Sequence, residues 1–98
     1  MKYAVLFEDN DEMAHMRPQF MADHLQFLAD NSQIIEIAGP MKDGQSGEPA
    51  GGLWVVDADS AEQVQALVES DPFWPTGLRK SIRILEWTQV YAHGHKTI

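Results

Sequence analysis

The spacing of hydrophobic residues along the 98-residue chain changes several times, and each change predicts a new secondary-structure element. Tyr3 to Phe7 is apolar throughout, which is typical of a short strand covered on both faces. From about residue 13 to residue 30, Met, Phe and Leu recur at helical spacing. Pro18 either lies in the first turn of this helix, where its missing N–H is harmless, or kinks a longer helix. We favour a helix that begins near Pro18, after an irregular lead-in, and stops at Asn31.

Two further strands are predicted in the middle of the chain. Residues 34–38 are mostly β-branched, and Gly39-Pro40 is expected to close that strand. Residues 53–57, which are apolar up to Asp57, are predicted to form the next strand. Between the two strands, residues 41–52 contain four glycines and no β-branched residue, which predicts a mobile loop that either closes over a pocket or stays open.

A second helix and a final strand complete the pattern. Ser60 and Gln63 have the spacing of a capping box, in which each side chain bonds the backbone near the other, and Asp71-Pro72 ends the helix that follows. Residues 82–91 are rich in β-branched and aromatic side chains, and a slip in their alternation at Leu85 predicts a bulge. We therefore expect a single domain over residues 1–92 and a C-terminal tail over residues 93–98.

The predicted order β-α-β-β-α-β is that of α+β, ferredoxin-like domains with a four-stranded antiparallel sheet. Right-handed crossovers place both helices on one face of such a sheet and leave the other face bare. We expect Tyr3, Trp54 and Trp87 on the bare face, where a large exposed apolar surface is unfavourable. A homodimer formed through this open sheet face is the predicted solution.

Composition narrows the range of partners. A formal net charge of −8 repels phosphate backbones and anionic membranes, so neither nucleic acid nor a membrane surface is an expected partner. There is no cysteine, which excludes disulfides, thiolate nucleophiles and zinc–thiolate sites. No segment reaches the ~20 apolar residues of a membrane span, and the N-terminal apolar run is too short for a signal peptide. A cytoplasmic protein is expected.

The candidate chemistry centres on His24 and Asp71. His24 lies within the apolar stripe of the first helix, where an imidazole is shielded from water and can act as a general acid or base. Asp71 begins a break between elements that also contains Phe73 and Trp74. We hypothesise that Asp71 accepts a hydrogen bond from His24 and fixes its tautomer. The simpler alternative is a core histidine with a satisfied hydrogen bond and a turn aspartate that caps its own loop.

Other residues could complete this site. Arg17 precedes His24 by seven positions, which puts both on one helix face about 10.5 Å apart, so Arg17 could hold a substrate carboxylate; a surface arginine is the alternative. Phe73 and Trp74 would form the dry walls of the pocket. His93 and His95 could share a metal, but a frayed tail explains them more simply, and we predict no metal site. No cofactor is expected.

The chain resembles the YCII-related family of small bacterial proteins over nearly its whole length. The resemblance rests on short marks in a fixed order, namely the Tyr3-to-Phe7 strand, Arg17 seven before His24-Leu25, Ala38-Gly39-Pro40-Met41, Gly52, and Asp71-Pro72-Phe73 with Gly77. It implies a dimeric α+β barrel with ferredoxin-like protomers, related to the muconolactone isomerase fold, and a cleft lined by a His and Asp pair, here His24 and Asp71. One family member is a dehydrochlorinase of a chlorinated hydroxyhydroquinone. The sequence departs from the common pattern around Met21, at Trp74-Pro75 and in the tail, which leaves the pocket shape open.

Two functions of different classes follow. The first is a cofactor-independent isomerase or lyase that uses His24 and Asp71 to transfer a proton on a small aromatic or lactone-like acid. The second is a non-catalytic dimer that binds a small molecule in the same pocket. A third, weaker interpretation is a haem- or oxygen-handling dimeric barrel, since that architecture hosts such proteins. Fold alone does not choose among these functions.

Overall fold

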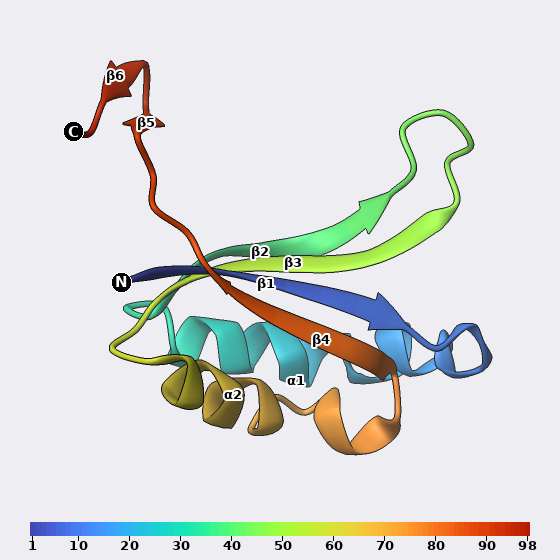
Figure 1. The fold of residues 1–98 in the computed structure, drawn as a ribbon. Helices are drawn as coiled ribbons and strands as arrows, with labels where there is room; N and C mark the ends of the chain where they lie inside the picture. The colour runs from blue at the N-terminus through green and yellow to red at the C-terminus, as the bar shows by residue number, and fades with distance from the viewer.

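A four-stranded antiparallel sheet carries two helices on one of its faces (Figure 1). The computed structural model describes residues 1–98. Its main elements are β1 (Lys2–Asp9), α1 (Met16–Asp30), β2 (Ile35–Lys42), β3 (Pro49–Asp57), α2 (Ala61–Glu69) and β4 (Arg79–Glu86), with short 3-10 helices η1 (Asp11–Met13) and η2 (Trp74–Thr76). The predicted α+β, ferredoxin-like order is confirmed.

The strands lie in the order β2-β3-β1-β4, so β1 is central and β2 and β4 are the sheet edges. On β1, Tyr3, Val5 and Phe7 are buried while their neighbours are half-buried or exposed. This alternation means that only the helix-facing side of β1 is fully covered, not both sides as the continuous apolar run predicted.

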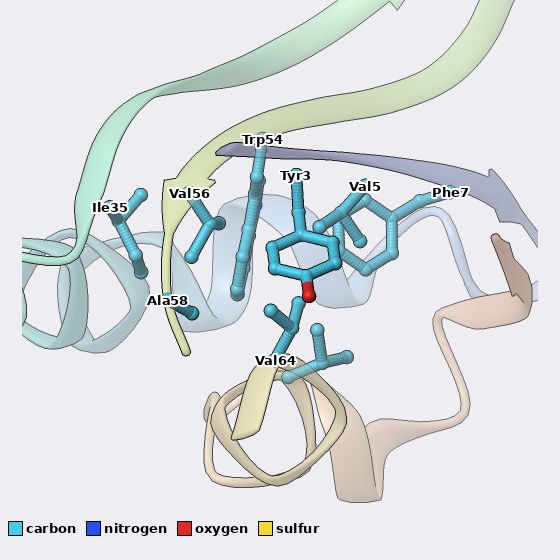
Figure 2. Close-up of a cluster of buried hydrophobic side chains, with 9 residues drawn as sticks. Tyr3, Val5, Phe7, Ile35, Trp54, Val56, Ala58 and Val64 are labelled. Carbon is cyan, nitrogen blue, oxygen red and sulfur yellow. The ribbon is translucent and has the colours of Figure 1, made fainter. Parts of the chain in front are cut away.

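The hydrophobic core lies between the sheet and the helices. Figure 2 shows side chains from the sheet directed toward α2, where Val64 meets them. Tyr3 and Trp54 belong to this core, with 4% and 2% of their surface exposed. The expectation that they lie on the open face was wrong. Residues that pair across β1 and β3 have their side chains on the same face of the sheet, and both Tyr3 and Trp54 lie on the face that the helices cover.

The first helix begins two residues before Pro18, which lies in its first turn, and η1 forms the irregular lead-in. The helix stops at Asn31 as predicted. Asn31 is not in the left-handed conformation, since its φ is −114°. Its side-chain amide instead donates to the Phe27 carbonyl at 2.8 Å.

The β2–β3 hairpin is longer than the sequence predicted. Gly39-Pro40 does not end β2 but pairs with Leu53 and Gly52 of β3. Proline is tolerated there because β2 is an edge strand and needs no inward donor at that position. Only residues 43–48 form the connecting loop, so half of the expected mobile segment belongs to the two strands of an arm that extends beyond β1 and β4 in Figure 1.

The second helix has the predicted cap. The Ser60 hydroxyl accepts from the Gln63 N–H at 3.1 Å. The side-chain Oε1 of Gln63 reaches back one residue further than in a standard capping box and accepts from the Asp59 N–H at 2.7 Å.

The last strand starts and ends earlier than expected, and its register shift does not lie near Leu85. Residues 82–86 pair regularly with β1, and the shift lies at the start of β4, where Ser81 pairs with Glu8, Arg79 pairs with Asp9, and Lys80 between them is the extra residue. The apolar alternation slips at Leu85 because both faces of β4 carry apolar side chains, Ile84 toward the helices and Leu85 on the open face.

Beyond β4, a small hairpin of β5 (Tyr91–Ala92) and β6 (His95–Lys96) stands away from the sheet on the side opposite the helices (Figure 1). It crosses the predicted boundary between domain and tail at residue 93. No helix of the structure combines the length and apolar character needed to cross a membrane.

Candidate functional site

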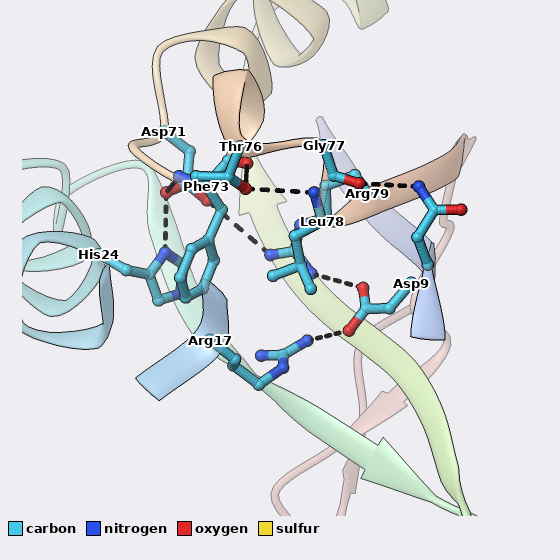
Figure 3. A network of polar contacts seen from close by, with 10 residues as sticks. Asp9, Arg17, His24, Asp71, Phe73, Thr76, Gly77, Leu78 and Arg79 are labelled. Atoms are coloured by element: carbon cyan, nitrogen blue, oxygen red, sulfur yellow. Dashed lines mark hydrogen bonds and ion pairs between the residues drawn. The ribbon is translucent and has the colours of Figure 1, made fainter. Parts of the chain in front are cut away.

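His24 is the only buried residue of α1 and retains 6% of its surface exposed. Its ring stacks on Phe73, with ring centroids 4.2 Å apart and an interplanar angle of 20°. The Nδ1 atom lies 2.9 Å from Oδ1 of Asp71 (Figure 3). The structure therefore brings together the two residues that the sequence proposed as a pair.

Asp71 is held in place by its own turn. It lies two residues after the end of α2, is 2% exposed, and its Oδ1 also accepts the Phe73 N–H at 3.1 Å. Its backbone carbonyl accepts from the Trp74 N–H at 2.8 Å. The Asp71 carboxylate therefore has both of the roles considered from the sequence: it caps its own turn and it pairs with His24.

The two aromatic residues of this turn have different positions. Phe73 is fully buried and packs directly against the His24 ring. Trp74 begins η2, is 37% exposed, and is not among the residues that line the cleft beside His24. The structure therefore does not bring Trp74 to the site as a pocket wall.

Arg79 contacts Asp71 of this pair directly, and Asp9 links Arg79 to Arg17. One Arg79 Nη lies 3.2 Å from Asp9 Oδ1, and the other lies 3.8 Å from Asp71 Oδ2. The second Asp9 oxygen accepts from Arg17. Figure 3 shows the resulting chain of charged side chains, which runs from His24 through Asp71, Arg79 and Asp9 to Arg17.

Arg79 is more buried than Arg17, the other cation of this network, with 4% of its side chain exposed. Its guanidinium carbon lies 4.0 Å from the Phe7 ring centroid and 5.3 Å from that of Phe73. Burial lowers the pKa of the Arg79 guanidinium, and the Asp9 carboxylate opposes that shift. The side chain remains charged, because arginine is not deprotonated in proteins.

A cleft of about 80 Å³ opens beside His24 between α1 and the β2–β3 arm. His24, Arg17, Arg79 and Trp54 line it, together with Met21, Leu25, Leu28, Ala38, Gly39, Pro40 and Gly52. No buried side-chain nitrogen or oxygen lacks a hydrogen-bond partner, and Nδ1 makes the single hydrogen bond of the His24 ring. The Nε2 atom of His24 is therefore not sealed in the core and is accessible from the cleft.

A second, larger groove of about 330 Å³ adjoins this cleft and shares Arg17 and Pro40 with it. Its other lining residues are Asp9, Met41, Lys42, Gly47, Pro49 and Gly51, most of them on the β2–β3 arm. Arg17 thus stands at the junction of the two spaces. No group of three or more His, Asp or Glu side chains is arranged to hold a metal ion, and His93 and His95 lie on the separate C-terminal hairpin.

The sequence did not single out Asp9, Arg79, Trp54 or Gly52 for this site. Asp9 and Arg79 occupy the ends of β1 and β4 and become neighbours only through antiparallel pairing. One signal in the sequence could have indicated this contact: Asp9 and Arg79 carry opposite charges and stand at the ends of two strands that were expected to pair. Gly52 and Trp54 lie two residues apart on the helix-facing side of β3, whereas Trp54 was expected on the open face.

The fold and site define a class of protein: a ferredoxin-like α+β domain with a His–Asp pair at a small cleft between its first helix and its sheet. Residues 1–88 match the YCII-related domain, and the chain belongs to that family.

Comparison with solved structures identifies a similar enzyme. The 5-chloro-2-hydroxyhydroquinone dehydrochlorinase TftG from Burkholderia phenoliruptrix, in complex with 2,5-dihydroxybenzoquinone, is 25% identical; the match covers 91% of this chain and 95% of that chain, with a TM-score of 0.79. A protein from Arabidopsis thaliana is 11% identical over 93% of this chain and 96% of that chain, with a TM-score of 0.48. Comparison with curated proteins gave no match.

Proposed function

We propose that this protein is a cofactor-independent lyase or isomerase that moves protons on a small hydroxylated ring or lactone-like acid. The observation that carries the proposal is the His24–Asp71 hydrogen bond at the edge of a cleft. An imidazole whose Nδ1–H is held by a carboxylate presents the lone pair of Nε2 to that cleft, which is the arrangement of a general base. The similarity to a dehydrochlorinase supports the same class of chemistry.

On a chlorinated hydroxyhydroquinone, the proposed reaction needs no oxidant. His24 Nε2 takes a hydroxyl proton and returns it to the ring carbon that bears chlorine, which gives the keto tautomer. Loss of a second hydroxyl proton, from the oxygen conjugated with that carbon through one ring double bond, expels chloride and leaves a quinone. The net change is the loss of one proton and one chloride ion. Asp71 stabilises the imidazolium that forms in each proton transfer.

The dimensions of the site suggest how such a ring binds. A dry cavity of about 150 Å³ accommodates benzene, so the cleft of about 80 Å³ beside His24 holds only part of a ring. The remainder extends past Arg17 into the groove along the β2–β3 arm. Arg17 uses one Nη for Asp9 and keeps other N–H groups for an oxygen substituent of the substrate.

We further propose a homodimer formed through the open sheet face. This face carries Leu6 and Leu53, which are register partners, and Leu85, which is 38% exposed. Trp87 and Ile37, at 45% and 64% exposed, extend the apolar surface. Such surfaces favour association in small domains. A cytoplasmic location stays a prediction.

The test is turnover of 5-chloro-2-hydroxyhydroquinone, followed by chloride release, by the wild-type protein and by His24→Gln. We expect chloride release by wild type and a loss of about a hundredfold or more in His24→Gln. His15→Gln is the matched control, because His15 is exposed at the start of α1. Equal turnover by His24→Gln and wild type, with circular dichroism showing both folded, would exclude His24 as the base.

The alternative is a binding dimer without catalysis. It predicts that 2,5-dihydroxybenzoquinone binds with the same affinity to wild type and His24→Gln while no substrate of this class is consumed by either protein. Isothermal titration beside the chloride assay separates the two functions.

A further inference from the structure

We propose that Arg79 is a positioning residue that keeps His24 in its neutral, proton-accepting form by balancing the charge of Asp71. The inference rests on the proposed function of His24 as a base. It concerns a residue at the start of β4 that acts on the reaction through Asp71.

Arg79 is placed to do this by contacts on three sides. Its two Nη atoms lie 3.2 Å from Asp9 Oδ1 and 3.8 Å from Asp71 Oδ2. The rings of Phe7 and Phe73 cover the guanidinium, and the Phe73 ring also stacks on His24. Figure 3 shows Arg79 between the two carboxylates, with His24 and Arg17 at opposite ends of the chain.

The charges of this cluster are balanced without His24. Asp9 and Asp71 supply two negative charges, and Arg17 and Arg79 supply two positive charges. Asp71 is 2% exposed, so water does little to screen its charge. With Arg79 present, the buried carboxylate already faces a cation and does not require His24 to become one.

Removal of Arg79 changes which group neutralises Asp71. The carboxylate would keep its hydrogen bonds from Phe73 N–H and from His24, and His24 would be the remaining group in contact with it that can take up a positive charge. A protonated imidazole is a good ion-pair partner but has no lone pair at Nε2. Without Arg79, therefore, the Asp71 carboxylate would favour protonation of His24, and protonated His24 cannot act as a base.

The test is the ¹⁵N spectrum of the His24 ring at about pH 7.5, which distinguishes the two neutral tautomers from imidazolium. We expect the neutral Nδ1–H form in wild type and, in Arg79→Gln, an imidazolium fraction raised by roughly threefold or more. Arg79→Lys keeps the charge and should restore most of the neutral form. Lys80→Gln is the matched control, because it removes one positive charge from the next, exposed position of β4.

An unchanged imidazolium fraction in folded Arg79→Gln would overturn the proposal, as would imidazolium as the main form in wild type. The wild-type and Arg79→Lys spectra decide the matter if Arg79→Gln does not fold. The ring spectrum requires no turnover, so it tests Arg79 even if chloride release fails. In the assay, a role through His24 predicts that Arg79→Gln lowers kcat more than it raises KM, whereas a purely structural role predicts loss of folded protein without a change in the tautomer.

Discussion

His24 and Asp71 are 47 residues apart in the chain, and their side chains meet at 2.9 Å. Each partner is fixed locally, His24 by its place on the inner face of α1 and Asp71 by the turn that follows α2. Phe73, two residues after Asp71, stacks on the His24 ring and limits its rotation. The imidazole is thus oriented before any ligand arrives, which reduces the entropy that binding and proton transfer would otherwise cost.

The first prediction concerns Asp71→Asn. An asparagine that turns its amide N–H toward Nδ1 stabilises the tautomer with the proton on Nε2, so the lone pair no longer faces the cleft. We expect kcat for chloride release to fall by about a hundredfold or more while the protein stays folded. Asp23→Asn is the matched control, because Asp23 is exposed and directly precedes His24. Wild-type kcat in folded Asp71→Asn would show that Asp71 only caps its turn.

The sequence predicted this pair because each residue carried its own signal: a histidine within an apolar helical stripe and an acid in a turn rich in aromatic residues. It could not predict the Asp9–Arg79 contact in the same way. Charges at strand ends usually indicate solvent contact, and these two residues meet only because β1 pairs antiparallel with β4 in one particular register.

The helix-facing residues of the sheet were assigned wrongly for a related reason. β1 and β3 read as apolar at almost every position, so period-two alternation could not show which set faces the helices. The Gly39-Pro40 step was interpreted as the end of a strand because proline interrupts sheets. It is instead accommodated at a sheet edge, and the edge position follows from topology, not from local sequence.

The second prediction uses two adjacent glycines of β3. A Cβ on Gly52 would meet Gly39 O at 3.4 Å and Arg79 Nη1 at 3.5 Å, which are ordinary contacts, and it would narrow the cleft. We expect Gly52→Ala to change the free energy of unfolding by less than about 1 kcal/mol and to weaken binding of a ring ligand by about tenfold. Titration with 2,5-dihydroxybenzoquinone measures the affinity.

Gly51→Ala should behave in the opposite way. Gly51 has a φ of +83°, and a Cβ there would lie 1.8 Å from the Phe7 carbonyl oxygen. We expect a loss of about 3 kcal/mol or more in stability. Gly44→Ala, with nothing within 4 Å of the added carbon, is the neutral control for both. Undiminished affinity in Gly52→Ala would place the ligand elsewhere.

The third prediction is a pH dependence in the loop of the β2–β3 arm. The backbone N–H groups of Ser46 and Gln45 donate to the Asp43 carboxylate and lower its pKa. Because the folded value lies below the unfolded one, the stabilisation is complete above about pH 4 and is lost as the pH falls through the lower, folded value. NMR titration should show the Ser46 amide shift moving with the Asp43 carboxyl carbon. Asp43→Asn should abolish that acid transition, and Glu48→Gln should keep it; a transition that survives in Asp43→Asn would assign it to another group.

The last prediction tests the proposed dimer. Leu85 lies opposite Ala4 on the open face of the sheet, and a lysine there would place a charge within the proposed interface. We expect light scattering to report a dimer for wild type and a monomer for Leu85→Lys at the same concentration, with helix and strand content unchanged. Val90→Lys is the control, because Val90 is 53% exposed beyond the end of β4 and outside the sheet. A wild-type monomer would contradict the dimer itself, whereas a dimer that persists in Leu85→Lys would move the interface away from this face.

The Leu85→Lys monomer also tests whether one protomer contains a complete site. The cleft opens on the helix side of the sheet and the apolar surface lies on the other side, so a folded monomer should retain the His24–Asp71 contact. Chloride release by that monomer would show that one protomer is sufficient.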